Sequence, residues 1–154
     1  RSLKETDINA NDALKVFLQF YEDGICVETD FYPGLREFLT ELQKKNIPVG
    51  ILTNKPQAMT DRLLDAMEIN NLFQFAYGPD IFGKKPAPGG LLKCLDILQL
   101  KASDVVMIGD HHTDMLAGNA VGTSTIFVSY GFGHKGESQV DYEIDSGEDL
   151  FKFL

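Results

Sequence analysis

The sequence predicts an α/β fold built on a parallel β-sheet, and two features of the chain lead to this prediction. Short apolar runs that end in glycine or polar residues alternate with longer segments whose apolar residues recur at helical spacing. The clearest run is Val105–Ile108, which leads into Gly109-Asp110 and is followed by a helical segment. A continuous apolar run of this kind is typical of a strand in a buried parallel sheet. Strands that alternate with helices then imply right-handed crossover connections.

The first half of the chain is expected to form three helices and two strands. Residues 9–23 place apolar side chains at i, i+3, i+4 and i+7 and end at Asp23-Gly24, which predicts a helix. A second helix is expected from Tyr32-Pro33-Gly34 to about Lys45, since lysines in a last turn are favourable against the helix dipole. The other expected elements are a strand over 48–53, a helix over 57–67 and a short strand over 73–77.

The second half continues the same alternation. A helix over 89–98 is expected to bury four leucines, which are Leu91, Leu92, Leu95 and Leu98. Strands over 104–108 and 123–128 flank a helix over 113–120, for which Thr113 is the expected N-cap. The glycine-rich segment 130–137 predicts a mobile loop, and residues 147–154 predict a short terminal helix.

Composition excludes several classes of protein. The 154 residues fit one domain, and 44% hydrophobic with 24% charged residues is ordinary for a soluble globular chain. A net charge of −9 argues against a nucleic-acid partner, which requires clustered lysine and arginine. No apolar run reaches the length of a membrane span. Cys26 and Cys94 have neither metal-site nor disulfide spacing, which favours a reducing cytoplasm.

Two carboxylates follow the Val105–Ile108 run, at Asp110 and Asp114. Ligands of open α/β sheets bind at the carboxyl ends of the strands, and hard oxygen donors there suit Mg²⁺. The structural alternative is that Asp110 caps a turn and Asp114 complements the helix N-terminus. These two residues alone do not decide between the readings.

Further polar motifs occur in a fixed order along the chain. A hydroxyl and an amide, Thr53 and Asn54, end the 48–53 strand, and Lys85 directly precedes a proline pair. With Gly109-Asp110 and Asp114, this order resembles the haloacid dehalogenase superfamily, specifically its phosphatases of the phosphoglycolate type. The motifs that carry the resemblance are Tyr32-Pro33-Gly34, Thr53-Asn54-Lys55-Pro56, Lys85-Pro86-Ala87-Pro88, Gly109-Asp110 and Tyr130-Gly131.

The resemblance implies a three-layer Rossmann-like core over residues 30–154, with residues 1–29 as the remnant of a helical cap. It implies Mg²⁺-dependent hydrolysis of a phosphomonoester through an aspartyl-phosphate. The substrate would be a small phosphorylated metabolite, with phosphoglycolate as the best single choice. Neither nucleic acid nor membrane is expected as a partner.

The resemblance also assigns roles to the site residues. Thr53 would donate its hydroxyl to a phosphate oxygen and Asn54 its backbone amide, while Lys85 would offset the charges of nucleophile and phosphate. Asp110 would bind Mg²⁺ directly and Asp114 through water or by orienting the ligand shell.

Two neighbouring features leave alternatives open. Lys84 is a second candidate for the role of Lys85. His111 and His112 suggest zinc but lack a third soft ligand nearby in the sequence, so they are interpreted as loop residues, and His134 as a solvated one.

The nucleophile of the family is not found in this sequence. Family members begin with a strand that ends in Asp-x-Asp, and no such motif follows an apolar run here, since Asp141 and Asp145 have the wrong spacing and position. The chain begins with Arg1, and its first methionine is Met59, so we interpret it as a piece of a longer protein, with propeptide cleavage as an alternative.

The missing strand would lie in the middle of the sheet, between the strands that end at Thr53 and Asp110. Either another segment or a second chain fills that place, which we favour, or the sheet closes up in a different arrangement. The chain alone is therefore predicted to be inactive. The alternatives are a catalytically silent module that binds a phosphate ligand or a partner chain, a dehalogenase and, less favoured, a receiver-like flavodoxin fold.

Overall fold

The computed structural model describes residues 29–154 continuously. It also describes eight earlier residues, which are Asn9, Asp12, Ala13, Lys15, Val16, Gln19, Gly24 and Cys26. The chain divides into two units, Arg1–Asp30 and Phe31–Leu154, and the elements described below belong to the second. The stripe residues of the helix expected over 9–23 lie outside the described residues, and a cap remnant at residues 1–29 stays a prediction.

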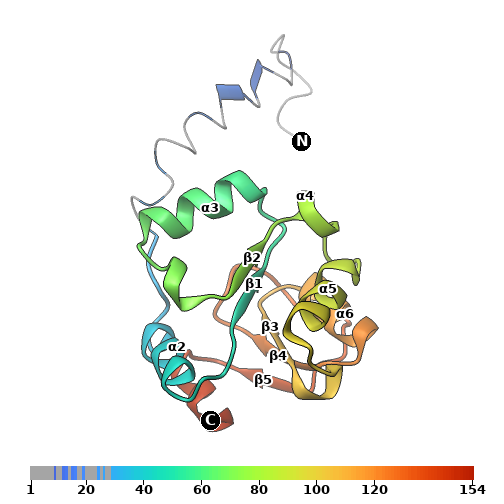
Figure 1. Cartoon of the computed structure of the whole chain (residues 1–154). Coiled ribbons are helices and arrows are strands. Elements are labelled where there is room, and N and C mark those ends of the chain that lie inside the picture. Colours follow the sequence, from blue (N-terminus) through green and yellow to red (C-terminus); the bar gives the residue numbers. More distant parts are fainter. Residues whose placement is uncertain are drawn as a thin grey trace. The chain divides into compact units, whose positions relative to one another are not determined.

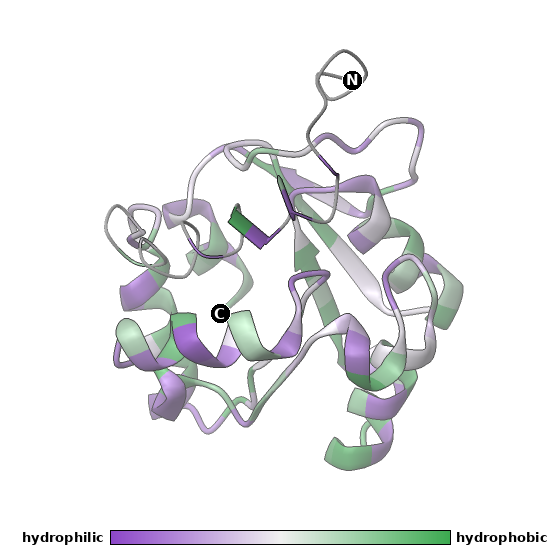
Figure 2. Ribbon diagram, turned by 90° about the horizontal axis from the view of Figure 1, so that it is seen from above, coloured by the Kyte–Doolittle hydropathy of each residue, from purple (hydrophilic) through white to green (hydrophobic). Residues whose placement is uncertain are grey.

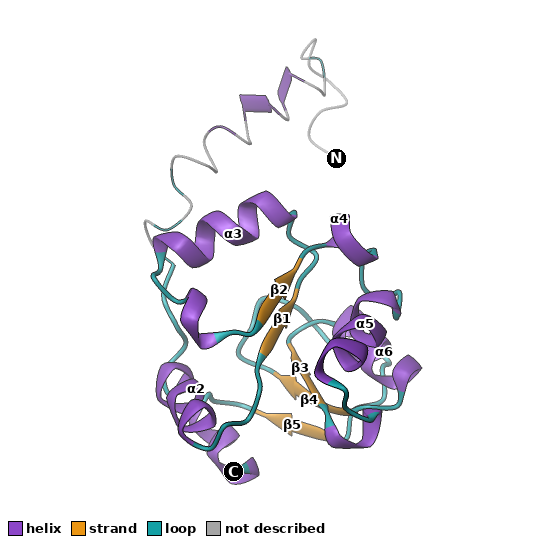
Figure 3. Cartoon of the chain, in the orientation of Figure 1, coloured by secondary structure: helices purple, strands orange, loops and turns teal. Residues whose placement is uncertain are grey.

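All strand pairs in the described part of the chain are parallel, which confirms the predicted α/β fold (Figure 3). β1 (Gly50–Leu52) pairs with β2 (Phe75–Tyr77) in a two-stranded sheet. β3 (Val106–Gly109), β4 (Ser124–Val128) and β5 (Tyr142–Ile144) form a three-stranded sheet in that order. β5 was not predicted.

Helices connect these strands. The α-helices are α2 (Leu35–Lys44), α3 (Gln57–Ala66), α4 (Pro79–Phe82), α5 (Gly89–Leu98) and α6 (His112–Val121). The 3₁₀ helices are η1 (Asn70–Leu72), η2 (Ala102–Asp104) and η3 (Glu148–Phe153). In Figure 2 the helices are banded in purple and green, as expected for segments with one apolar face. The expected helices after residue 30 are all present, the last of them as a 3₁₀ helix, whereas α4 was not predicted.

The core lies on both faces of β4. On one face, Ile126 and Val128 pack in a buried cluster with Phe38 of α2, Ile144 of β5 and Leu150 of η3. On the other face lies α6, which packs against β3 and β4 and whose Met115 and Ala117 are fully buried. Figure 1 shows α5 and α6 on one side of the three-stranded sheet and α2 with the C-terminus on the other. β4 is thus buried between two layers of helix, as is usual for a strand of a parallel sheet.

Two details of the predicted helices were wrong. Leu92 is 52% exposed, because the buried stripe of α5 runs instead through Gly90, Leu91 and Cys94. Helix α6 starts one residue before Thr113, and its N-cap is His111, whose side chain accepts a hydrogen bond from the Thr113 backbone.

The two sheets remain separate. Within residues 29–154, β1 pairs only with β2 and β3 only with β4, so one edge of each strand has no strand partner there. Val106 and Ile108 of β3 are 49% and 40% exposed, so the burial predicted for the Val105–Ile108 run was wrong for these two residues, which lie on a strand with one unpaired edge. The alternative in which the strands close up into one sheet is not observed.

Asp141 and Asp145 are occupied in holding β5 against β4. The carboxylate of Asp141 accepts hydrogen bonds from the backbone and hydroxyl groups of Thr125, at 2.7 and 3.0 Å. Asp145 accepts one from the Ser129 hydroxyl at 2.5 Å.

Among the described helices, none combines the length and apolar character needed to cross a membrane.

Candidate functional site

Lys85 lies at the centre of the candidate site. Its Nζ lies 2.6 Å from Oδ1 of Asp114, and both side chains are about nine-tenths buried. The same Nζ donates a hydrogen bond to the carbonyl of Leu52, the last residue of β1. Lys85 therefore joins the end of β1 to the first turn of α6. Lys84, the alternative candidate, is exposed.

Asn54 fixes the backbone of Lys85 from both sides. Its Oδ1 accepts a hydrogen bond from the Lys85 backbone N–H at 2.8 Å, and its Nδ2 donates one to the Lys85 carbonyl at 3.1 Å. The predicted role of Asn54 involved only its backbone amide, so this side-chain contact was not predicted. No local pattern indicates it, because the two residues are 31 positions apart.

Thr53 follows β1, and its hydroxyl accepts a hydrogen bond without donating one within the described residues. Its backbone N–H donates to the Tyr77 carbonyl at 2.9 Å, which extends the pairing with β2. Its Oγ1 accepts a hydrogen bond from the Lys55 backbone at 3.1 Å. No acceptor for the hydroxyl hydrogen is found in the described residues. A threonine hydroxyl both accepts and donates, so Thr53 can still donate to an anionic group.

Both oxygens of the Asp114 carboxylate have partners. Oδ1 contacts Lys85, and Oδ2 accepts a hydrogen bond from the His111 backbone at 3.1 Å, which forms a capping box at the start of α6. Gly109 makes this position possible, because a Cβ there would lie 2.4 Å from Oδ2 of Asp114. Asp114 thus neutralises Lys85 and caps α6.

Asp110 follows the last residue of β3 and is held through one oxygen. Oδ2 accepts hydrogen bonds from the backbone N–H groups of Phe132 and Gly133, at 2.8 and 3.0 Å. Gly131 permits this approach, since a Cβ there would lie 2.2 Å from Cβ of Asp110. Oδ1 has no hydrogen-bond partner among the described residues. The glycine-rich segment, predicted as a mobile loop, is thus hydrogen-bonded to the carboxylate.

Residues from distant parts of the chain therefore meet at the carboxyl ends of β1 and β3. Direct contacts connect Leu52 and Asn54 to Lys85, and Lys85 to Asp114. Asp110 joins them through His111, its neighbour in the chain, whose backbone bonds to Asp114. The free Oδ1 of Asp110 fits Mg²⁺, which binds through one or two carboxylates, waters and phosphate oxygens. Asp114, with both oxygens engaged, fits an indirect role.

Two other titratable groups near these elements have shifted pKa values. Burial, followed by the neighbouring rings of His111 and His134, lowers the pKa of His112 below its usual range. Burial raises the pKa of the Cys94 thiol to about 11, which favours the protonated thiol at neutral pH.

The chain matches one known protein family over most of its length. The model of the haloacid dehalogenase-like hydrolase family matches residues 1–128. A phosphoglycolate phosphatase of Pseudomonas fluorescens is 36% identical over 129 residues, which are 83% of this chain and 47% of that protein. One from Colwellia psychrerythraea is 34% identical over 124 residues, covering 80% of this chain and 55% of that protein. The chain thus spans about half the length of these curated relatives.

Solved structures show the same fold. A crystal structure described as a predicted phosphoglycolate phosphatase, from Haemophilus somnus, superposes with a TM-score of 0.89 at 22% identity. It covers 97% of this chain and 69% of that one. A haloacid dehalogenase-like family protein of Streptococcus pneumoniae gives a TM-score of 0.81 at 21% identity, over 96% of this chain and 72% of that one. At these identities the likeness concerns the fold.

Proposed function

This chain belongs to the haloacid dehalogenase-like hydrolase family, and we propose that it forms the larger part of the core of a Mg²⁺-dependent phosphomonoester hydrolase. The observation that carries the proposal is the buried Lys85–Asp114 pair at the end of β1, beside a carboxylate with one free oxygen. Because phosphoryl transfer requires mainly positioning and charge neutralisation, a fixed cation next to a free carboxylate oxygen suits it.

Each residue of the site has a proposed task. The hydroxyl hydrogen of Thr53 donates to a phosphate oxygen, and the backbone N–H of Asn54 donates to another. The ammonium group of Lys85 offsets the charge of the phosphate and the attacking carboxylate, and the Asn54 side chain holds the backbone of Lys85 in place. Asp114 pairs with the ammonium group of Lys85 and orients it.

Asp110 is proposed to hold Mg²⁺ through Oδ1, while the loop amides fix Oδ2. The ion, when bound, supplies positive charge that lowers the barrier to attack on the phosphorus. Asp114 supports the ligand shell indirectly, since its own oxygens are engaged by Lys85 and the His111 backbone.

The nucleophile is proposed to be an aspartate from outside these 154 residues. No Asp-x-Asp follows an apolar run in the sequence, and the named relatives are about twice as long as the part that this chain matches. Attack by that aspartate would form an aspartyl-phosphate, which water then hydrolyses. Phosphoglycolate is the proposed substrate, on the names of the relatives alone.

A catalytically silent module is the second candidate, favoured by the same lack of Asp-x-Asp. It would bind a phosphate ligand or a partner chain through Thr53 and Lys85.

A cytoplasmic location, proposed from the unpaired Cys26 and Cys94, fits both candidates.

An assay of the full-length gene product separates the two candidates. We expect it to hydrolyse phosphoglycolate and a generic aryl phosphate with Mg²⁺, to stop when a chelator removes the ion, and to resume when Mg²⁺ is restored. The 154-residue chain alone, assayed beside it, should release no phosphate. Turnover that survives the chelator would refute the metal-dependent mechanism. An inert product whose gene encodes no Asp-x-Asp would support the silent module.

The free edges of β1 and β3 lead to a related proposal about partners. We infer that a strand from another segment, or from a second chain, pairs with both edges, because unpaired backbone groups there are costly if buried. The exposed Val106 and Ile108 would then be covered.

The melting behaviour of the 154-residue chain tests this proposal. Alone, the chain is expected to self-associate or to unfold over a broad temperature range, and the full-length product should give one cooperative transition. Calorimetry with size-exclusion chromatography measures both properties. A sharp melt from a monomeric 154-residue chain would show that no additional strand is needed.

A further inference from the structure

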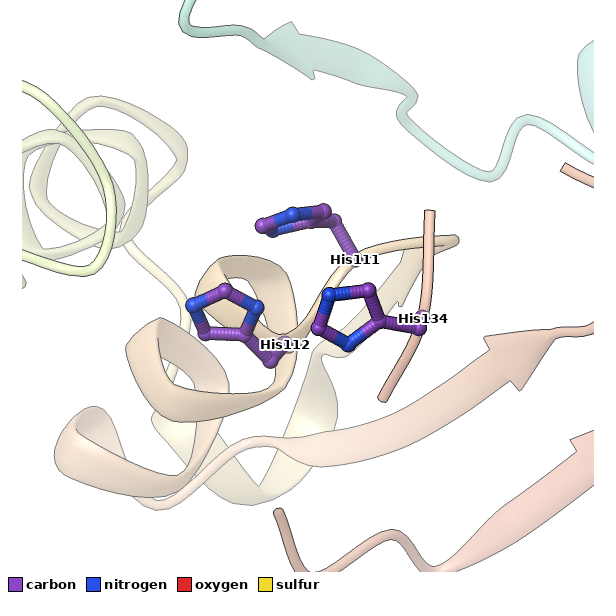
Figure 4. A group of neighbouring side chains, drawn as sticks. All are labelled: His111, His112 and His134. Carbon is purple, nitrogen blue, oxygen red and sulfur yellow. The ribbon is translucent and has the colours of Figure 1, made fainter. Parts of the chain in front are cut away.

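The three histidines of the sequence come together beside the start of α6. His111 and His112 are adjacent in the chain, and His134 follows 22 positions later, on the loop after β4. Figure 4 shows the three rings gathered in one place, contributed by these two segments. One ligand atom from each ring lies within 4.8 Å of the others. The fold therefore brings His134 to the two adjacent histidines as the third ligand, which the sequence alone did not indicate.

Backbone hydrogen bonds bring the two segments together. The His112 N–H donates to the His134 carbonyl at 2.8 Å. The backbone N–H groups of the two residues before His134, Phe132 and Gly133, donate to the Asp110 carboxylate. Neither contact uses an imidazole ring, so the rings are held close while their nitrogens stay available for a ligand.

The nitrogens of the cluster have few other partners. Nδ1 of His112 is buried and makes no hydrogen bond, although a buried polar atom usually has a partner. In His111 only Nδ1 is engaged, 3.0 Å from the Thr113 hydroxyl and 3.3 Å from the Thr113 backbone N–H. As long as Nδ1 accepts from the Thr113 backbone, the proton of a neutral imidazole is on Nε2. Metal binding through Nε2 requires the other tautomer, in which Nδ1 donates to the Thr113 hydroxyl in place of that bond, the arrangement usual for metal-binding histidines. No hydrogen bond joins the three rings in the described residues.

We propose that His111, His112 and His134 bind one divalent transition-metal ion of the Zn²⁺, Co²⁺ or Ni²⁺ class. Imidazole nitrogen suits these ions, whereas Mg²⁺ prefers oxygen donors, so this site is chemically distinct from the carboxylate of Asp110. Tetrahedral Zn²⁺ with bonds of about 2.0–2.1 Å separates its nitrogen ligands by about 3.4 Å. The observed ligand atoms lie within 4.8 Å of one another, so the rings must move closer together when they bind the ion. Three protein ligands leave a fourth position open to water or another ligand.

Metal titration of the full-length gene product tests the site. Calorimetry with Zn²⁺, and visible absorption with Co²⁺, would be recorded in excess Mg²⁺ to occupy oxygen sites. The test variant is His134→Gln, which removes a ligand on an exposed loop and keeps the backbone carbonyl that binds His112. Its matched control is Lys135→Gln, one residue along the same loop. Cys26→Ser excludes binding through that thiol.

We expect the wild-type protein and both controls to bind Zn²⁺ equally. The His134→Gln variant should bind about 100-fold more weakly or worse, because loss of even an outer partner of a metal ligand costs about 10- to 100-fold. If circular dichroism shows that this variant is misfolded, His112→Asn provides the same comparison. Equal Zn²⁺ affinity in the wild type and a folded histidine variant would overturn the proposal, as would no binding by the wild type.

Discussion

Replacement of Lys85 by methionine is expected to lower the free energy of unfolding by about 3–5 kcal/mol. Lys85 and Asp114 form an ion pair at 2.6 Å in which both side chains are about nine-tenths buried. Methionine retains most of the volume of lysine but leaves the Asp114 carboxylate without its counter-charge. The Leu52 carbonyl loses its contact with the ammonium group at the same time. The cost arises from desolvated groups left unpaired.

Urea denaturation of Lys85→Met beside Lys93→Met measures this effect. Lys93 and Asp96 form an ion pair with the same N–O distance of 2.6 Å, but their side chains are 42% and 63% exposed. Because solvent screens an exposed pair, its removal should cost far less than removal of the buried one. Comparable losses in the two variants would mean that the Lys85–Asp114 pair contributes no more to stability than a surface contact.

Replacement of Asp110 by asparagine is expected to reduce kcat/KM of the full-length product by at least about 100-fold. A metal ion supplies several kcal/mol of transition-state stabilisation, and each 1.4 kcal/mol or so corresponds to a factor of ten. Asparagine retains an oxygen that can accept the Phe132 and Gly133 amides, so the loop should remain in place. The loss would then reflect the weaker metal ligand.

Steady-state kinetics across a Mg²⁺ titration, with Asp145→Asn as the control, measures this prediction. Asp145 is an exposed carboxylate that accepts one hydrogen bond, from Ser129, outside the candidate site. The control should keep wild-type kcat/KM and Mg²⁺ dependence. An Asp110→Asn variant with near wild-type turnover would remove Asp110 from the proposed mechanism.

Hydrophobic spacing was enough to predict most of the fold. The segment 89–98 matches α5, and the apolar residues before Gly109 match β3, because the spacing of apolar residues along the chain is a local signal. β5 could not be found in this way. Only Ile144 of its three residues is buried, and the strand is fixed by its pairing with β4 and by the Asp141–Thr125 hydrogen bonds.

The candidate site was predictable only as far as its motifs. The motifs correctly indicated Thr53 at the end of β1, Asp110 at the end of β3, and Lys85, which contacts the last residue of β1. The roles of these residues stay proposals. The Asn54 side chain and the His134 ring were missed. Both depend on contacts between residues 22 or more positions apart, which spacing along the sequence does not encode.

The Phe132 and Gly133 amides bind the Asp110 carboxylate, so the length of the turn after β4 determines the position of that side chain. Insertion or deletion of one residue between Gly131 and His134 would shift the amides that bind Asp110. The same change would displace the His134 ring from His111 and His112. Attempts to retune ligand preference by varying this turn should therefore conserve its length and leave Gly131 unsubstituted. The fully exposed side chain of Phe132 is the position there to diversify.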